Sequence, residues 1–170
     1  MSSNINRFIF FIIFFALIDQ LSKLFIINYF DIDVNHLATE ALYVINDYLN
    51  LYIVWNKGFA FGLFQNDMNF INNIYICLMI IIAVGLFIYG IKINKKIYFF
   101  SLSLIIGGAI GNLIDRYFYN AVLDFIDLHY ANLHWYVFNI ADITITIGCI
   151  LIIILEIIST KKKEQNGLKN

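Results

Sequence analysis

Residues 107–116 read GGAIGNLIDR, and the fold depends on the solvent that surrounds this stretch. It closes a segment, 97–114, without a single charged residue, but Asn112, Asp115 and Arg116 then occur within five positions. A charged side chain at the centre of a bilayer costs about 2.5–3.5 kcal/mol on insertion scales, and such groups tend to face a bundle interior and carry function. If the segment crosses a membrane, its polar end therefore marks a functional site.

The composition indicates that the solvent is a membrane. Of the 170 residues, 61% are hydrophobic and 14% are charged, and the mean hydropathy is +0.78. Soluble domains are roughly half apolar and about a quarter charged. The formal net charge of −1 gives no reason to expect a nucleic-acid partner.

Four segments have the about 20 mostly apolar residues that a helix needs to cross a bilayer, namely 8–29, 70–91, 97–117 and 137–158. The first contains Asp19 and Lys23 where a secretory signal would have its cleavage motif, so we interpret it as a retained span. The sequence predicts an all-α integral membrane protein with one four-span domain over residues 1–160. Residues 161–170 are expected to form a disordered basic tail.

The basic residues predict the orientation of these spans. Eight of the eleven Lys and Arg residues flank the same side of the four spans: Arg7, Lys92, Lys95, Lys96, Lys161, Lys162, Lys163 and Lys169. That side is expected to be cytoplasmic, with both termini, while loops 30–69 and 118–136 face outward. In the first loop, residues 42–56 favour short strands that form a small β-rich cradle, and Gly58 suits tight backbone geometry. In the second, residues 123–139 have apolar side chains near helical spacing and predict an interfacial helix.

Polar side chains recur at the outer ends of the spans. Asp19 and Lys23 are four residues apart on one helix face, and Gly107 with Gly111 forms a small-xxx-small pair that lets another helix approach closely. Further polar residues on single helix faces are Asn112, Asp115, Arg116, Asn139, Asp142 and Thr146. Each of these residues could instead have a purely structural role, such as an ion pair that links helices or an anchor at the membrane interface. Their convergence at one depth indicates a shared polar site.

The residue types at this depth favour carboxylate chemistry. The sequence contains no GxSxG and no HExxH motif. Cys77 and Cys149 fall in the middle of spans, away from the polar layer, and are expected to be packing residues. The three histidines, His36, His129 and His134, are expected to be interfacial or solvated, and no metal or cofactor is predicted. Two carboxyl groups held close together share a proton, so one activates water while the other polarises a carbonyl.

Five sequence blocks resemble a known family in the same order. They are DQLSK (19–23), NKGFAFG (56–62), GGAIGNLIDR (107–116), VLDFID (122–127) and FNIAD (138–142), and the family is lipoprotein signal peptidase, the bacterial signal peptidase II. The resemblance implies that the catalytic pair is Asp124 and Asp142. It implies further functional positions at Asp19, Lys23, Asn56, Asn112, Arg116 and Asn139. The chain departs from the family's usual pattern at Tyr136, commonly Pro, and at Ile143, commonly Ser.

The resemblance also implies the reaction. An aspartic endopeptidase would cut a prolipoprotein just before its diacylglyceryl-modified cysteine, without metal or organic cofactor. It would work as a monomer in the bacterial inner membrane, with the site toward the extracytoplasmic face and membrane lipid as its other partner. A small transporter or channel subunit remains an alternative, although it predicts polar residues deeper on the inner side. A structural scaffold leaves the cost of the polar layer unexplained.

Overall fold

The computed structural model describes residues 3–34, 37, 40–58, 68–93 and 95–167. The helices are α1 (Ser3–Tyr29), α2 (Met68–Ile93), α3 (Lys96–Tyr119) and α4 (Ile140–Gly167). The strands are β1 (Ala41–Asn46), β2 (Leu49–Asn56), β3 (Val122–Tyr130) and β4 (Leu133–His134). All four helices are long and apolar enough to span a membrane, as the sequence predicts.

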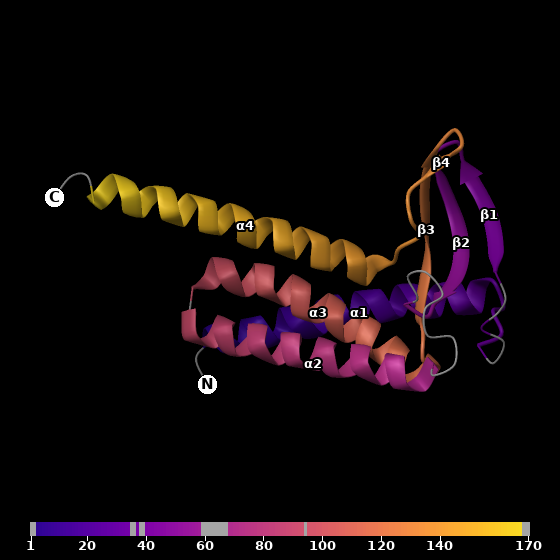
Figure 1. The fold of residues 1–170 in the computed structure, drawn as a ribbon, viewed down its shortest axis with the longest axis horizontal. Coiled ribbons are helices and arrows are strands. Elements are labelled where there is room, and N and C mark those ends of the chain that lie inside the picture. The colour runs from indigo at the N-terminus through magenta and orange to yellow at the C-terminus, as the bar shows by residue number, and fades with distance from the viewer. Residues whose placement is uncertain (1–2, 35–36, 38–39, 59–67, 94, 168–170) are drawn as a thin grey trace.

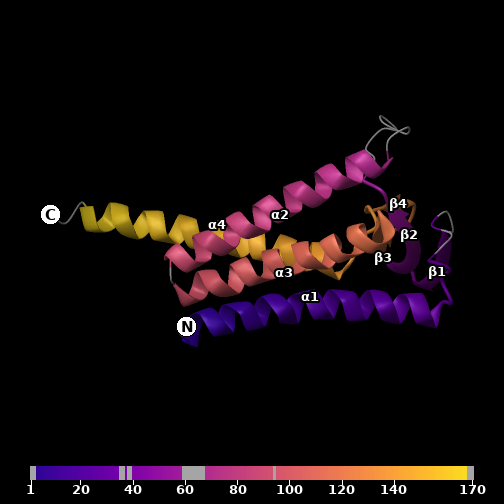
Figure 2. The same cartoon turned by 90° about the horizontal axis from the view of Figure 1, so that it is seen from below.

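The helices form a bundle with α3 at its centre. α3 contacts each of α1, α2 and α4, and Figure 2 shows it between α1 and α2. In its most apolar stretch 67% of the residues are buried, against 28% or fewer in the corresponding stretches of the other spans. The remaining helices expose many Ile, Leu and Phe side chains outward, a pattern typical of helices that face lipid. The helix with GGAIGNLIDR is therefore the core of the fold.

The strands form one antiparallel sheet in the order β1-β2-β3-β4. Figure 1 shows the sheet at one end of the bundle, whereas α1 begins, α2 meets α3 and α4 ends at the other. A second hydrophobic core joins the sheet to the last turns of α1 through Ile26, Ile53, Trp55, Leu123 and Phe125. The strands predicted within 42–56 are confirmed as β1 and β2.

Two expectations from the sequence are wrong. Residues 123–139 do not form an interfacial helix, because β3 pairs with β2 and turns into β4 at Ala131, whose φ is +52°. The spacing of apolar residues in 123–139 fits a strand as well as a helix. The strand that pairs with it, β2, is distant in sequence, so the sequence alone did not reveal the pairing. The basic tail is not disordered from residue 161, because α4 continues to Gly167; residues 168–170 lie outside the described part.

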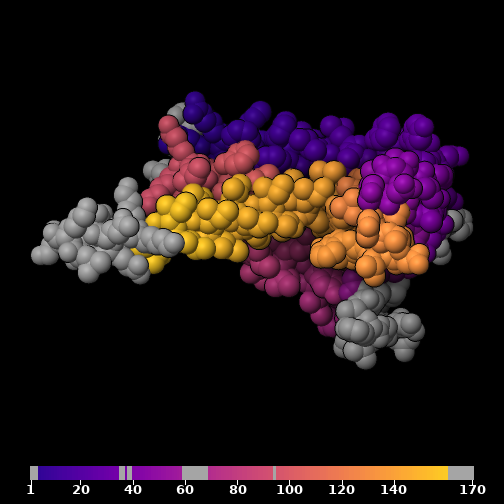
Figure 3. Space-filling view, turned by 90° about the horizontal axis from the view of Figure 1, so that it is seen from above, coloured from indigo at the N-terminus to yellow at the C-terminus, as the bar shows by residue number. Residues whose placement is uncertain are grey.

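Figure 3 shows α4 lying along the bundle with its first turns against the sheet. This contact matters because α3 ends, β3 begins and α4 begins at the same level of the molecule (Figure 1). Side chains from three elements that are separate in the sequence therefore meet there.

Candidate active site

A buried ion cluster joins α1 to α3. Lys23 Nζ lies 2.8 Å from Asp19 Oδ2 and 2.8 Å from Asp115 Oδ2, and all three residues are almost completely buried. Backbone donors support the two carboxylates: Ala141 N–H donates to Asp19 Oδ1 at 2.8 Å, and Leu123 N–H donates to Asp115 Oδ2 at 3.1 Å. Ala141 is in the first turn of α4, where the helix dipole favours an anion. The cluster therefore also fixes the start of α4 and of β3.

The close approach of α1 requires glycine on α3. A Cβ at Gly111 would collide with the carboxylate of Asp19, and one at Gly107 would lie 2.7 Å from Cβ of Phe15. The small-xxx-small prediction for this pair is confirmed, and its helix partner is α1. Because the backbones come so close, Asp19 reaches across α3 to the first turn of α4.

Asn112 connects the ion cluster to Asp142. Its Oδ1 accepts a hydrogen bond from Lys23 Nζ at 2.9 Å, and its Nδ2 donates to Asp142 Oδ1 at 3.0 Å. A lysine can only donate, so the amide oxygen must face Lys23 and the NH2 group must face the carboxylate. The charge of Lys23 thus sets which end of Asn112 meets Asp142.

The start of α4 holds Asp142 in a reciprocal cap. Asn139, the residue before the helix, accepts the Asp142 N–H at its Oδ1 (3.0 Å), and Asp142 Oδ2 accepts the Asn139 N–H (3.2 Å). This is the arrangement of a capping box, which satisfies two N–H groups that a helix start leaves free. Asn139 Nδ2 remains available, and it donates to Asn112 Oδ1 at 3.1 Å and to Asp124 Oδ1 at 2.6 Å.

Asp124 reaches the site from β3. Asn120 ends α3 in the left-handed conformation (φ +54°) and turns the chain back into the strand. The two oxygens of the buried Asp124 carboxylate accept the Nδ2 groups of Asn139 and of Asn56, the latter at 2.9 Å. Burial raises the pKa of Asp124 to about 7, and the nearby Asp142 carboxylate adds to the rise, while the hydrogen bonds from Asn56 and Asn139 oppose it.

Asp142 opens onto a groove at the surface of α4. The groove has a volume of about 240 Å³. Its lining consists of Asp142 with Trp135, Tyr136, Phe138, Ile143, Thr146 and Ile147. Both family departures, Tyr136 and Ile143, line this groove beside the carboxylate. The groove can receive an apolar group and lay it next to Asp142.

Arg116 and Gly58 lie at the edge of the network. Gly58 has a φ of +80°, its N–H donates to Asn56 Oδ1 at 2.8 Å, and its carbonyl accepts from the Tyr75 hydroxyl at 2.7 Å. The Arg116 guanidinium lies 4.6 Å from the centroid of the Tyr75 ring. This places Arg116 beside Gly58, so the turn that holds Asn56 is tied to α2 and α3.

The structure thus brings all ten candidate residues from the sequence into one connected region at the sheet end of the bundle. Sequence reasoning missed three residues. Gln20 Nε2 donates to Asp115 Oδ1 at 2.9 Å, and Asn72 Nδ2 donates to the Arg116 carbonyl at 3.0 Å. The third residue is Tyr75, which contacts Gly58 and Arg116. Gln20 and Asn72 are amides inside apolar spans, the same signal that identified Asn112.

The other candidate groups lie away from this network. Cys77 and Cys149 are both exposed on the outer surface of their helices, so they face outward and not into a packed core. Among the described residues, Asp127, His129 and His134 form a cluster whose ligand atoms could hold a metal ion, although the sequence did not predict one. His36 lies outside the described part.

Comparison with known proteins agrees with this arrangement. A family model described as signal peptidase (SPase) II matches residues 11–158. A lipoprotein signal peptidase of Pelagibacter ubique (strain HTCC1062) is 44% identical over 146 residues, which cover 85% of this chain and 84% of the relative. Another, from Anaplasma phagocytophilum (strain HZ), is 39% identical and covers 82% of this chain and 85% of its own length.

A solved structure also resembles the whole fold. It is described as a bacterial membrane enzyme at 2.3 Å resolution, and it matches with a TM-score of 0.74 at 30% identity over 93% of this chain and 92% of the other. The similarity in fold is thus accompanied by sequence identity over most of both chains. The chain belongs to the signal peptidase II family of membrane peptidases.

Proposed function

We propose that this protein is an aspartic endopeptidase that removes the signal peptide from prolipoproteins by cutting before a diacylglyceryl-modified cysteine. Asp124 and Asp142 act as its catalytic pair. The observation that carries this proposal is that both carboxylates accept hydrogen bonds from one neutral amide pair, Asn112 and Asn139, beside an apolar groove. The names of the relatives support the choice of a lipoprotein substrate.

The pair has the protonation that the reaction needs. With a pKa of about 7, Asp124 is protonated in about half of the molecules at neutral pH, so the form in which the pair holds one proton is well populated. The ionised carboxylate takes a proton from water as the oxygen bonds to the scissile carbonyl carbon. The protonated one donates a hydrogen bond to the carbonyl oxygen. Its proton then moves to the cysteine nitrogen as the C–N bond breaks, which leaves a peptide carboxylate and a free amine on the lipid-modified cysteine.

The supporting residues act by position. Asn112 and Asn139 each have an oxygen that is occupied by a donor, Lys23 in one case and the Asp142 N–H in the other. Their NH2 groups therefore point toward the carboxylates. Asn56, Gly58 and Arg116 hold the edge of the site, where the peptide would lie along the sheet.

The groove supports a lipid-modified substrate. Its lining is almost entirely apolar, and it lies on the outer side of α4, where an acyl chain in the bilayer could reach it sideways. The cysteine would then lie beside Asp142 while its acyl chains run along Ile143 and Ile147. A protein that works in this way needs the bilayer as the route of its substrate.

We further propose that the protein lies in the inner membrane as a monomer, with both termini cytoplasmic and the sheet on the extracytoplasmic face. The start of α1 and the junction of α2 with α3 lie at the end of the bundle far from the sheet (Figure 1), and they carry Arg7, Lys92, Lys95 and Lys96, which supports this orientation. Reporter fusions at Lys96 and Asn46 test it. Lys96 should report as cytoplasmic and Asn46 as external, and the reverse result would overturn the orientation.

The decisive experiment is cleavage of a synthetic prolipoprotein segment by purified protein in detergent, with products identified by mass. The diacylglyceryl-modified segment should be cut before its cysteine. The same peptide without lipid should be cut far more slowly, and Asp142→Asn should cut neither. Equal cleavage of both peptides would reject the lipid-modified substrate. Cleavage by Asp142→Asn would reject the catalytic pair.

The same assay separates this reaction from other chemistries. The double variant Cys77→Ala, Cys149→Ala and treatment with chelator should each leave cleavage largely intact, because the proposed reaction uses neither thiol nor metal. A channel or transporter would instead conduct a solute in vesicles and cut nothing. The described spans offer a solute few polar groups along their length, since the buried polar residues other than Ser101 and Ser103 gather toward the sheet end of the bundle.

A further inference from the structure

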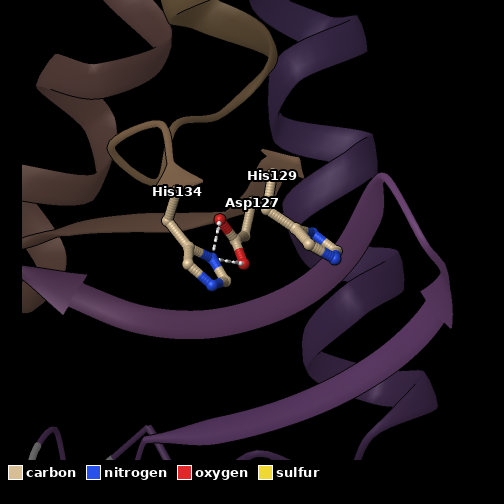
Figure 4. A group of neighbouring side chains, drawn as sticks. All are labelled: Asp127, His129 and His134. Atoms are coloured by element: carbon tan, nitrogen blue, oxygen red, sulfur yellow. Dashed lines mark hydrogen bonds and ion pairs between the residues drawn. The ribbon is translucent and has the colours of Figure 1, made fainter. Parts of the chain in front are cut away.

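The β3–β4 hairpin holds a second cluster of reactive side chains, separate from the carboxylate pair. Asp127 and His129 are two residues apart on β3, so they share a face of the strand. His134 on β4 is the register partner of His129. Figure 4 shows the Asp127 carboxylate next to the His134 ring, with the His129 ring beside it. One ligand atom from each residue lies within 4.8 Å of those of the other two.

The carboxylate of this cluster is buried and poorly compensated. Asp127 is 2% exposed. His134 Nδ1 lies 2.9 Å from Asp127 Oδ2 and 3.1 Å from Oδ1, and within the described part of the chain Asp127 forms no ion pair with a lysine or arginine. Asn50 supplies the other contact, with its Nδ2 at 2.9 Å from Asp127 Oδ2 and 3.2 Å from His129 Nδ1. A buried acid with so few partners costs free energy unless a cation joins it.

A second, independent observation lies in the same place. Asn50 is buried and its Oδ1 has no hydrogen-bond partner. Rotation of this amide by half a turn would bring the orphaned oxygen, a hard metal ligand, to the position that Nδ2 occupies between Asp127 and His129. The orphaned atom is thus one rotation away from the two ligands that it would join.

We propose that Asp127, His129 and His134 bind a divalent transition-metal ion of the Zn²⁺ class. Two imidazoles and a carboxylate form a ligand set that Zn²⁺ accepts, whereas Mg²⁺ and Ca²⁺ prefer oxygen ligands. The ion has an entry path, because Asp127 and His134 line a hollow of about 650 Å³ and the His134 side chain is 50% exposed. Water or the amide oxygen of Asn50 fills the fourth position.

The bound ion would stabilise the elements that hold the active-site carboxylates. It ties β3 to β4, and Asp124 lies three residues before Asp127 on the same strand. The backbone of Phe138, next to Asn139, pairs with Ile126 of β3. The site is therefore structural, and the inference stands whether or not the proposed cleavage reaction is correct.

The test is a titration of untagged, chelator-treated full-length protein in detergent with Zn²⁺ alone, followed by calorimetry and by the melting temperature. We expect one Zn²⁺ per chain and a higher melting temperature, with no such response to Mg²⁺. Co²⁺ should give the visible absorption of a tetrahedral site. His134→Ala, which alters an exposed side chain, should weaken binding at least about tenfold, and Asp127→Asn should do the same.

Asp31→Asn is the matched control, since Asp31 is an exposed acid that lies outside the cluster and in a left-handed conformation that Asn tolerates. It should bind Zn²⁺ like the wild type. The proposal is overturned if the wild type binds no stoichiometric Zn²⁺, or if His134→Ala binds it with unchanged affinity. The cluster would then be only a hydrogen-bonded group of Asp127, His134 and Asn50.

Discussion

Two groups of carboxylates lie at the same end of the bundle, and they are held in opposite ways. Asp19 and Asp115 share the charge of Lys23, with both distances at 2.8 Å. Asp124 and Asp142 accept hydrogen bonds from neutral amides, of which Asn139 serves both. The first group has a lysine at ion-pair distance, whereas the second has amide groups as its hydrogen-bond partners and opens to a groove.

The difference explains why one group holds the fold and the other is suited to react. Asp19 and Asp115 are both held by Lys23 and by backbone N–H groups, so their contacts join α1, α3 and the starts of β3 and α4. A buried carboxylate with neutral partners keeps a raised pKa, as Asp124 does, and exchanges a proton near neutral pH. Asn112 contacts both groups, so the ion cluster orients the amide that faces Asp142.

The largest expected effect is on the pair of Asp124 and Asp142. Asp124→Asn and Asp142→Asn should each lower kcat/KM at least about a thousandfold, because the amide cannot exchange a proton, and the double variant should be little worse. The melting temperature should change little. The measurement is turnover of lipidated segment per folded molecule. Asp31→Asn, the exposed control, should cleave normally, and near wild-type turnover by either single variant would contradict the assignment.

The ion cluster should respond in stability. Lys23→Met leaves two buried carboxylates without their cation, and we expect the free energy of unfolding to fall by about 3–5 kcal/mol. Turnover per folded molecule should fall far less than in the pair variants, because Asn112 Oδ1 still accepts from Asn139. Thermal unfolding in detergent and folded yield measure this. Lys92→Met, at an exposed lysine of α2, should cost little, and equal stability of both variants would reject a structural role for Lys23.

A smaller effect tests the closeness of α1 and α3. Gly111→Ala puts a methyl group against the Asp19 carboxylate, so overpacking should cost about 1–3 kcal/mol of unfolding free energy. Gly85→Ala is its control, since nothing lies within 4 Å of a Cβ there and alanine favours a helix by about 1 kcal/mol. Thermal unfolding should therefore separate the two variants in opposite directions. If both substitutions change the stability in the same direction, helix propensity, and not contact with Asp19, determines the effect of the substitution at Gly111.

The smallest effect is a shift in pH dependence. The folded-state pKa of Asp124, about 7, lies above the ordinary value of 3.8 for this side chain, so the folded protein binds more protons than the unfolded one between these values. The contribution of Asp124 to stability is therefore lost as pH rises through that window. Cleavage should decline above about pH 7, where the pair loses its shared proton.

Asn56→Ala sharpens this expectation. Its hydrogen bond lowers the Asp124 pKa, so removing it should move the alkaline decline of kcat/KM to higher pH. The measurement is the pH profile of kcat/KM for both proteins. A decline that moves to lower pH, or does not move, would contradict the role of Asn56 as a stabiliser of the anion.

The parts of the site that could be predicted show their evidence within a single segment of the chain. The parts that could not be predicted depend on contacts between distant segments. Polar residues inside apolar spans identified Asp19, Lys23, Asn112 and Asp115 without any structure, because their cost in a bilayer is visible in the sequence. Asn72 gives the same signal and was overlooked. The strand character of 123–130 was missed, because its partner β2 is distant in the chain and the apolar spacing fits either structure.

By itself the sequence determined the four apolar spans, the distribution of basic residues and the depth in the membrane at which polar side chains gather. Length, hydropathy and charge are properties of single segments, so they can be determined without a structure. Only the tertiary structure decided which carboxylates are paired with a cation and which with amides. Asp19 reaches Ala141 across 122 positions, and Asn56 reaches Asp124 across 68. Such contacts depend on how closely two backbones approach and which end of an amide faces inward. Both follow from the packing of all the elements together.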